Sequence, residues 1–231
     1  PDGFLSEIQN ASRRGFTGGN DSLANEQAES VNYGVVYTPS WAEGLDLSVD
    51  YIKIDVKDAI VSFTLTDILN ACYDATDFPN AFCSQFTRMD NGQFPGVSAF
   101  TSGYVNAALR NFEGIEYAMN YRNELADYPL VGGLFGEGSG DLNWSLRMFN
   151  QRKNETSNTG FDFTDDTGQW NEPDWTANLQ VSYALDDLFA FVDFNYTGET
   201  DRNVEQTEPL QYIDQNGNPY TKVPSLMTVD I

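Results

Sequence analysis

The first candidates for chemistry in this sequence are its two cysteines, Cys72 and Cys83. They lie close together in a segment rich in Asn, Asp and Pro. In an oxidising compartment such a pair would form a disulfide, which stabilises a short loop by about 3 kcal/mol on the chain-entropy model. In a reducing compartment the same residues would be two unpaired thiols. Because neither a CxxC motif nor a metal-binding constellation includes them, the spacing favours the disulfide.

Histidine is absent from all 231 residues. Its absence excludes Ser-His-Asp and Cys-His nucleophilic catalysis, His-ligated zinc and the usual proton shuttle near neutral pH. Carboxylate-pair chemistry of the glycosidase type needs only Asp and Glu, but no pair stands out at a catalytic spacing. The sequence therefore predicts that the protein is not an enzyme and has no catalytic residue.

The chain is strongly acidic, with 12 Lys and Arg against 35 Asp and Glu and a formal charge of −23. This charge would repel a phosphate backbone, so no nucleic acid is expected as a partner. Carboxylate oxygens suit hard cations, and Asp165 and Asp166 are the candidates for a calcium site. The motif "DDTG" that holds them matches no full calcium loop and is also typical of a turn. No other cofactor or metal is expected.

The elements that must position these side chains are strands. Several segments of about ten residues alternate apolar and polar positions, the period of a strand whose two faces meet different surroundings. In "LDLSVDY", for example, Leu45, Leu47 and Val49 alternate with Asp46 and Ser48. The pattern predicts about seven strands, over residues 31–37, 45–51, 115–121, 142–148, 175–185, 192–196 and 227–231.

The connections between these strands alternate in length. They are short at "PSWAEG" and "DD" and intermediate at "NELADYPLVGGLFGEGSG". They are long over residues 58–100, 154–173 and 198–222. Short turns on one side and long loops on the other are typical of a transmembrane β-barrel, whereas a soluble β-sandwich has no reason to separate its loops in this way.

Aromatic residues support the same fold class. The chain contains no apolar run long enough to be a transmembrane helix. Tyr and Trp are favourable in any strand, but a membrane barrel also places them where its wall meets the two membrane surfaces. Their recurrence near strand ends predicts an interfacial girdle made of Tyr37, Tyr51, Tyr121, Trp175 and Tyr196.

Two stretches of this sequence resemble the barrel of TonB-dependent outer-membrane receptors. The first is a Gly-Asn-x-x-Leu-x-x-Glu stretch, a Thr-Pro turn and a Gly-Leu-x-Leu-x-Val-x-Tyr-x-x-Ile strand, in which Ala24 and Asn25 replace the usual Lys-Pro. The second is an extracellular loop with a short helical segment "ILNACY" and an Arg-x-x-x-Gly-Gln turn. The matching residues are Gly19, Asn20, Leu23, Glu26, Thr38, Pro39, Gly44, Leu45, Leu47, Val49, Tyr51 and Ile54, then Cys72, Cys83, Arg88, Gly92 and Gln93.

The resemblance implies an all-β fold, an antiparallel transmembrane β-barrel with long extracellular loops, of which this chain supplies about seven of about 22 strands. Residues 1–231 are then part of the barrel domain, and the N-terminal plug domain and the final strands are not expected within them. The location implied is the bacterial outer membrane. Membrane lipid, lipopolysaccharide and, through the plug, TonB are the implied partners.

The function implied is energised uptake of a scarce nutrient, such as a ferric siderophore or an oligosaccharide. Loop rings could stack on such a ligand, and they could equally pack the loops against each other. The candidate ligand contacts are Tyr73, Phe78, Phe82, Phe86, Phe161, Phe163 and Trp170.

Two other functions fit parts of the sequence. A soluble, secreted β-rich carbohydrate-binding or glycosidase module would use the apolar faces as a core, and dependence on detergent would distinguish it from a barrel. A passive outer-membrane channel or adhesin would keep the barrel, and the lack of a plug domain would favour it.

Overall fold

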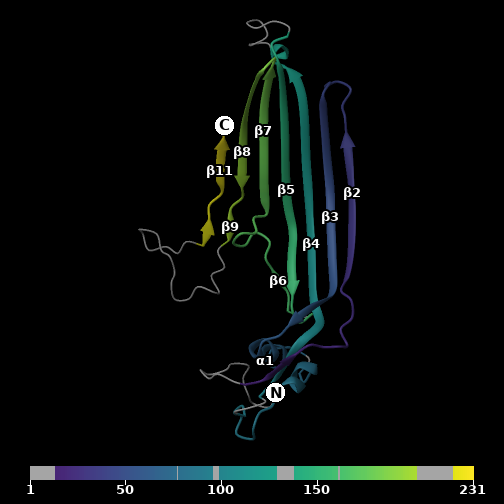
Figure 1. Ribbon diagram of the computed structural model, residues 1–231, viewed down its shortest axis with the longest axis vertical. Coiled ribbons are helices and arrows are strands. Elements are labelled where there is room, and N and C mark those ends of the chain that lie inside the picture. Colours follow the sequence, from purple (N-terminus) through teal and green to yellow (C-terminus); the bar gives the residue numbers. More distant parts are fainter. Residues whose placement is uncertain (1–13, 77, 96–98, 129–137, 161, 202–220) are drawn as a thin grey trace, which may run out of the picture. The chain divides into compact units, whose positions relative to one another are not determined.

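The computed structural model describes residues 14–76, 78–95, 99–128, 138–160, 162–201 and 221–231. Its main element is an antiparallel sheet with the strand order β11-β8-β7-β5-β4-β3-β2 (Figure 1). The strands of this path are β2 (Gln27–Tyr37), β3 (Leu45–Ser62), β4 (Thr101–Glu124), β5 (Asp141–Ser157), β7 (Trp175–Leu185), β8 (Leu188–Thr197) and β11 (Leu226–Asp230).

Shorter elements lie in the connections between these strands. The short strand β1 pairs with β4 in parallel, β6 pairs with β5, and β9 pairs with β10 in a separate ladder. Their bounds are β1 (Phe16–Gly18), β6 (Thr164–Asp165), β9 (Thr200–Asp201) and β10 (Lys222–Val223). The helices are α1 (Leu65–Tyr73) and the 3-10 turns η1 (Ala81–Gln85) and η2 (Leu125–Asp127).

The chain divides into two compact units. The first contains the described residues up to Glu29 together with Asp55–Arg110 and Thr156–Thr164. The second contains Ser30–Ile54, Asn111–Glu155 and the described residues from Asp165 onward. Strands β3, β4 and β5 each contribute residues to both units, so each unit is described by itself below.

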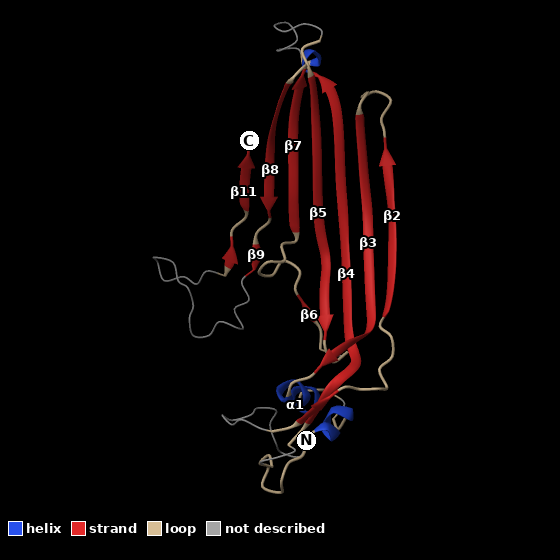
Figure 2. Ribbon diagram, in the orientation of Figure 1, coloured by secondary structure: helices blue, strands red, loops and turns tan. Residues whose placement is uncertain are grey.

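The strands of the second unit form a single layer (Figure 2). Their register places apolar side chains in rows. Across β5, β7, β8 and β11, the row through Leu146, Leu179 and Phe194 ends at Val229. Because side chains alternate between faces along a strand, every second row lies on one side of the sheet. Further pairs on this apolar face are Trp144 with Val181, Met148 with Ala177, Val181 with Val192, and Tyr196 with Met227.

The opposite face of this sheet is mainly polar. The row next to the leucines runs through Ser145, Gln180 and Asp193 to Asp230. Side chains of this polar face form hydrogen bonds with one another. The Asn178 amide donates to the carboxylate of Asp193, and it donates to Asn195 Oδ1 at 2.9 Å. The sheet therefore separates an apolar surface from a hydrogen-bonded polar one.

No described element covers the apolar face of the second unit. Val229 keeps 50% of its surface exposed although it ends the central apolar row. The buried apolar residues instead belong mainly to the first unit, where Leu65, Leu69, Phe94 and Ala99 form a small core. A soluble sheet would bury such a face, whereas a barrel wall presents it to lipid. None of the described helices is long and apolar enough to span a membrane.

The alternation of short and long connections is confirmed. The β2–β3 turn occupies only the residues from Thr38 to Gly44, and β7 and β8 are joined by Asp186 and Asp187. Gly44 adopts φ +83°, a left-handed conformation that glycine tolerates best, and its carbonyl accepts from the Arg122 N–H at 3.0 Å. These turns lie at what we call the turn end of the second unit, and the long connections leave from its loop end.

The predicted strands all exist, but their bounds are corrected. Strand β3 continues to Ser62, so the long connection starts there and not near Asp58, and β4 begins at Thr101, well before Ile115. Strand β5 likewise extends to Ser157. A membrane strand needs only about 9–11 residues. The extensions go beyond this length, and their sequences lack the alternation on which the prediction rests.

We expect Leu179→Arg to destabilise the protein by about 2–4 kcal/mol, because the new charge would lie at the centre of the apolar face and in the hydrocarbon. Gln180→Arg is the matched control, since it adds the same side chain one residue later on the polar face, at an expected cost below about 0.5 kcal/mol. Unfolding of the complete protein in phospholipid vesicles measures both free energies. Equal losses for the two variants would contradict a lipid-facing apolar surface.

Candidate functional site

The first unit contains a loop closed by the disulfide between Cys72 and Cys83, which confirms that prediction. Helix α1 leads into it and is preceded by the N-cap residue Thr64. The Thr64 side chain accepts from the Asp67 N–H, while the Asp67 carboxylate accepts from the Thr64 N–H at 2.8 Å. This reciprocal cap satisfies groups that a helix terminus otherwise leaves unpaired. The Asn80 side chain then donates to the Ala71 carbonyl at 2.8 Å. The loop is therefore a built structure and not a loose connection.

Several aromatic residues predicted to contact a ligand pack inside this loop. The Tyr73 ring stacks on Phe78 with centroids 5.7 Å apart and contacts Phe86 at 5.6 Å. The Phe82 ring meets Phe63 edge-on at 5.1 Å. Such pairs contribute about 0.5–1.5 kcal/mol each beyond the area that they bury. Their main structural role is thus to hold the loop together, and contact with a ligand stays a prediction.

Arg88 lies among these rings. Its guanidinium carbon is 4.3 Å from the Phe94 centroid and 5.5 Å from that of Tyr73. Its Nη1 donates to the Gly92 carbonyl at 2.8 Å, and its Nε donates to the Tyr73 hydroxyl at 3.2 Å. The resemblance had matched Arg88 and Gly92, but the rings of Phe63 and Phe94 that complete the cluster were missed, because nothing local distinguishes them from other loop residues.

The other candidate ligand contacts belong to the next long connection. Phe163 lies exposed in the first unit, and Trp170 lies exposed in the second. Phe161 falls outside the described residues. Contact of these rings with a ligand stays a prediction.

The predicted girdle residues all belong to the second unit, and they lie at its two ends. Tyr51 contacts Tyr33 at 5.0 Å and Trp175 stacks on Tyr117 at 6.1 Å, both toward the loop end, where Tyr196 also lies. Tyr37 and Tyr121 lie toward the turn end. The girdle role stays a prediction, to which the structure adds Tyr33 and Tyr117 by contact.

The length of the apolar face suits a membrane. On β7, Trp175 and Tyr183 lie on the apolar face near its two ends. Eight residues at about 3.4 Å each place them roughly 27 Å apart, close to the height of about 25 Å that barrel walls present to lipid. Beyond the loop-end aromatics, ion pairs replace apolar contacts, as Lys53 lies 3.5 Å from Glu113 and Lys153 lies 2.9 Å from Glu155.

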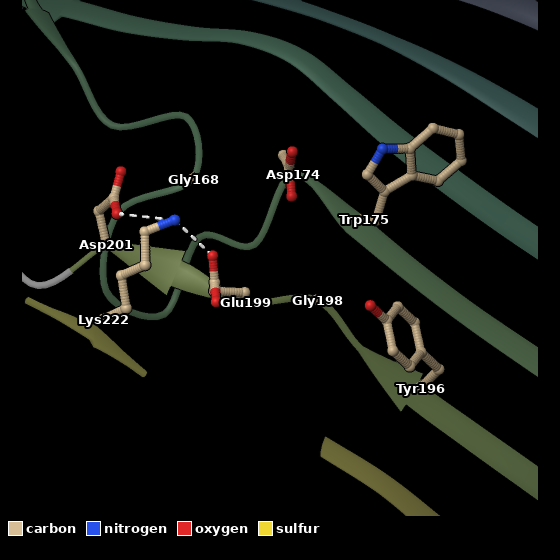
Figure 3. Close-up of a pocket in the computed structure, with 8 residues that line it drawn as sticks. All are labelled: Gly168, Asp174, Trp175, Tyr196, Gly198, Glu199, Asp201 and Lys222. Atoms are coloured by element: carbon tan, nitrogen blue, oxygen red, sulfur yellow. Dashed lines mark hydrogen bonds and ion pairs between the residues drawn. The ribbon is translucent and has the colours of Figure 1, made fainter. Parts of the chain in front are cut away.

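A pocket of about 270 Å³ lies at the loop end of the second unit (Figure 3). Lys222 Nζ lies 2.5 Å from Glu199 Oε1 and 3.9 Å from Asp201 Oδ1. The hydrogen bond with Glu199 raises the pKa of Lys222, and the charges of Glu199 and Asp201 add to this effect. The Asp201 N–H also donates to the Gly168 carbonyl at 2.6 Å. Lys222 thus neutralises part of an acidic pocket and holds β10 beside β9.

The weak calcium candidates form a turn. Asp165 Oδ1 accepts from the Thr167 N–H at 2.9 Å, and the Asp166 carbonyl accepts from the Gln169 N–H at 3.0 Å. No group of three or more His, Cys, Asp or Glu side chains that could hold a metal ion occurs among the described residues. Calcium binding by the acidic loops stays a prediction.

The polar face of the second unit contains a cavity of about 460 Å³. Glu116 and Arg147 line it with opposite charges, and Asn178 and Asn195 contribute amides. Phe149 adds a ring that stacks on Phe112 at 6.1 Å. This face can form many hydrogen bonds but brings together no nucleophile and base.

The family follows from comparison with known proteins. Residues 3–231 match the family model described as TonB dependent receptor-like, beta-barrel. The chain belongs to the TonB-dependent receptor family. This membership confirms the resemblance and the antiparallel barrel fold, and it agrees with the prediction that the protein is a receptor and not an enzyme.

Solved structures of this fold match the chain along most of its length. The ferric enterobactin receptor PfeA of Pseudomonas aeruginosa, in a mutant bound to enterobactin, shares 17% identity at a TM-score of 0.50, over 92% of this chain and 24% of the receptor. A second PfeA mutant shares 16% identity at a TM-score of 0.50, over 92% of this chain and 24% of the receptor. The FrpB iron transporter of Neisseria meningitidis shares 12% identity at a TM-score of 0.49, over 93% of this chain and 25% of the transporter. No curated protein sequence matches.

These identities show the fold alone, and this TonB-dependent receptor chain spans about a quarter of the length of the solved structures that it matches. What the match explains is the sheet, because a barrel wall needs one lipid-facing and one lumen-facing surface.

We expect replacement of both Cys72 and Cys83 by Ser to expose the loop between Phe63 and Pro95 to protease while β7 and β8 stay resistant. The disulfide stabilises the folded loop by about 3 kcal/mol, because it reduces the entropy of the unfolded loop. The strands are stabilised independently by the sheet. Limited proteolysis followed by mass spectrometry of the fragments measures this. Wild-type protein reduced with dithiothreitol is the matched control. A loop that resists protease in either sample would show that the disulfide does not hold it.

Acid is expected to loosen the Asp165 turn. Burial alone would raise the pKa of Asp165, but hydrogen bonds from Thr167 and from the Asn154 backbone, helped by Lys153, hold that pKa below its usual value. The stabilisation is therefore present above the ordinary Asp pKa of about 3.9 and is lost as the pH falls through the lower folded value.

Hydrogen exchange of the Thr167 amide, corrected for the intrinsic pH dependence of exchange, should lose protection between about pH 5 and pH 2. The Asp165→Asn variant should show no such change. Equal dependence on pH in both proteins would contradict a role for the Asp165 charge.

Proposed function

We propose that this chain forms part of the barrel wall and outer loops of an energised transporter in the bacterial outer membrane. The observation that carries the proposal is the pairing of apolar rows on one face with polar rows on the other, within a chain that matches the receptor barrel over residues 3–231. A wall of this kind separates lipid from a polar lumen. The soluble-module alternative loses its support, because it needs the apolar face as a core.

The proposed partners follow from the position of charges and rings. Tyr51, Trp175 and Tyr196 would lie at the outer membrane surface, where aromatic rings favour the headgroup region. Acidic loop residues such as Glu199 would meet lipopolysaccharide through divalent cations. TonB would act through a plug domain in the lumen, facing the cavity between Glu116 and Arg147.

The proposed ligand is a nutrient too large or too rare for passive pores, captured by the long loops. Ferric siderophores and oligosaccharides are the two classes to consider. The solved structures similar in fold include a ferric enterobactin receptor. That protein makes a ferric siderophore the reference ligand against which an oligosaccharide must be tested.

Energised transport is tested by uptake in cells with and without TonB. The complete receptor is expressed in a host lacking its own receptors, and accumulation of radiolabelled ferric enterobactin and of radiolabelled neutral hexasaccharides is followed. We expect one of these ligands to accumulate in the TonB-containing host and to fall to background without TonB. Accumulation that is equal in both hosts would show a passive channel and refute the proposal.

A matched control separates transport from folding. The Leu179→Arg and Gln180→Arg pair, expressed in the same host, should differ in the amount of receptor in the outer membrane but not in uptake per receptor. A receptor that remains monodisperse in buffer without detergent would contradict the proposal that this sheet forms a wall in a membrane.

A further inference from the structure

Residues 19–26 of the first unit connect β1 with β2 without belonging to a strand, and we call this connection the strap. Strand β1, which precedes it, pairs with β4 through the backbone, with Gly18 opposite Gly103. Beyond Gly18, side chains take over the contact with β4. The Asn20 side chain, for example, donates to the Tyr104 carbonyl at 3.0 Å.

Asn106 of β4 is the centre of the contacts that hold the strap. Its Oδ1 accepts from the Ala24 N–H at 2.8 Å, and its Nδ2 donates to the Ala24 carbonyl at 2.9 Å. One side chain thus pairs with both backbone groups of Ala24, as a neighbouring strand would. The same Nδ2 donates to the Asp58 carbonyl of β3 at 2.7 Å. Asn106 therefore ties the strap and β3 to β4 at one point.

A carboxylate makes a second link between the strap and β3. Glu26 Oε1, at the end of the strap, accepts from the Ile60 N–H at 2.7 Å. Ile60 follows Asp58 by two residues, so both links reach the same short stretch of β3. Ala24, Glu26 and Ile60 are all exposed to solvent. Hydrogen bonds of this kind add little net stability, because water can replace either partner.

The backbone of Asp58 is strained at this stretch. Its φ is +56°, in the left-handed region, although the residue lies inside β3. Strand residues ordinarily have φ of about −120° to −140°. A residue other than glycine stays in a left-handed conformation only where surrounding contacts hold it there. The bond from the Asn106 amide to the Asp58 carbonyl is such a contact, so its release would let Asp58 return to the extended conformation.

The disulfide loop of the same unit is held in a different way. It contains the covalent link between Cys72 and Cys83, and it buries Leu69 and Phe94. The strap contains neither a cysteine nor a buried residue. Segments with few buried apolar contacts and exposed hydrogen bonds open locally at a lower free energy than a packed core. The strap can therefore open while the disulfide loop stays folded.

We propose that the strap is a latch on the outer side of this transporter, closed by Asn106 and strained at Asp58. In the closed state, Asn106 holds Ala24 and Asp58 together. In the open state, the strap leaves β4 and the backbone of Asp58 relaxes, while the strands and the disulfide loop stay folded. The position of the latch on the outer side of a membrane rests on the proposed function.

Hydrogen exchange of the complete receptor in detergent, without ligand or TonB, tests the latch. The amides of Ala24 and Ile60 are the probes, because each donates to a side chain of the latch. Asn106→Ala removes three hydrogen bonds and should speed exchange at both amides by about tenfold. Asn111→Ala is the matched control, since it makes the same change on the same strand, and it should leave both amides unchanged.

The variant Asp58→Gly distinguishes one latch from two independent contacts. Glycine adopts a left-handed φ freely, so this change removes strain from the closed state and should slow exchange at Ala24 by about threefold. In the Asn106→Ala background, the same change should have no effect on Ala24, because Asp58 is then already relaxed. The double variant thus measures the coupling between the strap and the strained residue.

Two results would overturn the proposal. The first is exchange at Ala24 and Ile60 that does not respond to Asn106→Ala, in protein whose α1 amides remain as protected as in wild type. The second is that the effects of Asp58→Gly and Asn106→Ala on Ala24 simply add. Failure of the transport proposal appears elsewhere, as uptake that does not depend on TonB in a receptor whose latch responds as expected.

Discussion

The physical constraint on which this structure depends is that one layer of strands must separate two unlike surroundings. Hydrocarbon offers no hydrogen-bond partners, so the backbone groups of the wall must pair with neighbouring strands. The side chains then divide by face, with Leu146 and Leu179 in one row and Ser145 and Gln180 in the next. The alternation along each strand thus gives the wall one apolar and one polar surface.

The long loop of the first unit therefore has to build a core of its own. It does so with a capped helix, a disulfide and a cluster of rings, in which Leu69 and Phe94 are buried. Arg88 takes part in this cluster. Its guanidinium lies over Phe94 and donates to the Gly92 carbonyl, so this cation stabilises the loop.

The excess of acidic residues shapes what such a surface can bind. Lys222 lies between Glu199 and Asp201, and Lys53 and Lys153 pair with neighbouring glutamates. These three lysines thus already stabilise the strands and turns of the chain itself. Such an acidic surface attracts cations electrostatically, and it binds uncharged ligands through stacking and neutral hydrogen bonds.

The sequence by itself determined the strands, their two faces, the short and long connections, and the cysteine pair, because alternation and turn composition are local properties that survive without tertiary context. It did not determine where β4 begins, since the segment from Thr101 has no contrast between its faces. Only the tertiary structure decided that Tyr73 packs on Phe86, and that Phe16 of β1 lies opposite Thr101 of β4. Those contacts join residues distant in the chain through the pairing of β1 with β4 and the folding of the disulfide loop, which no local pattern encodes.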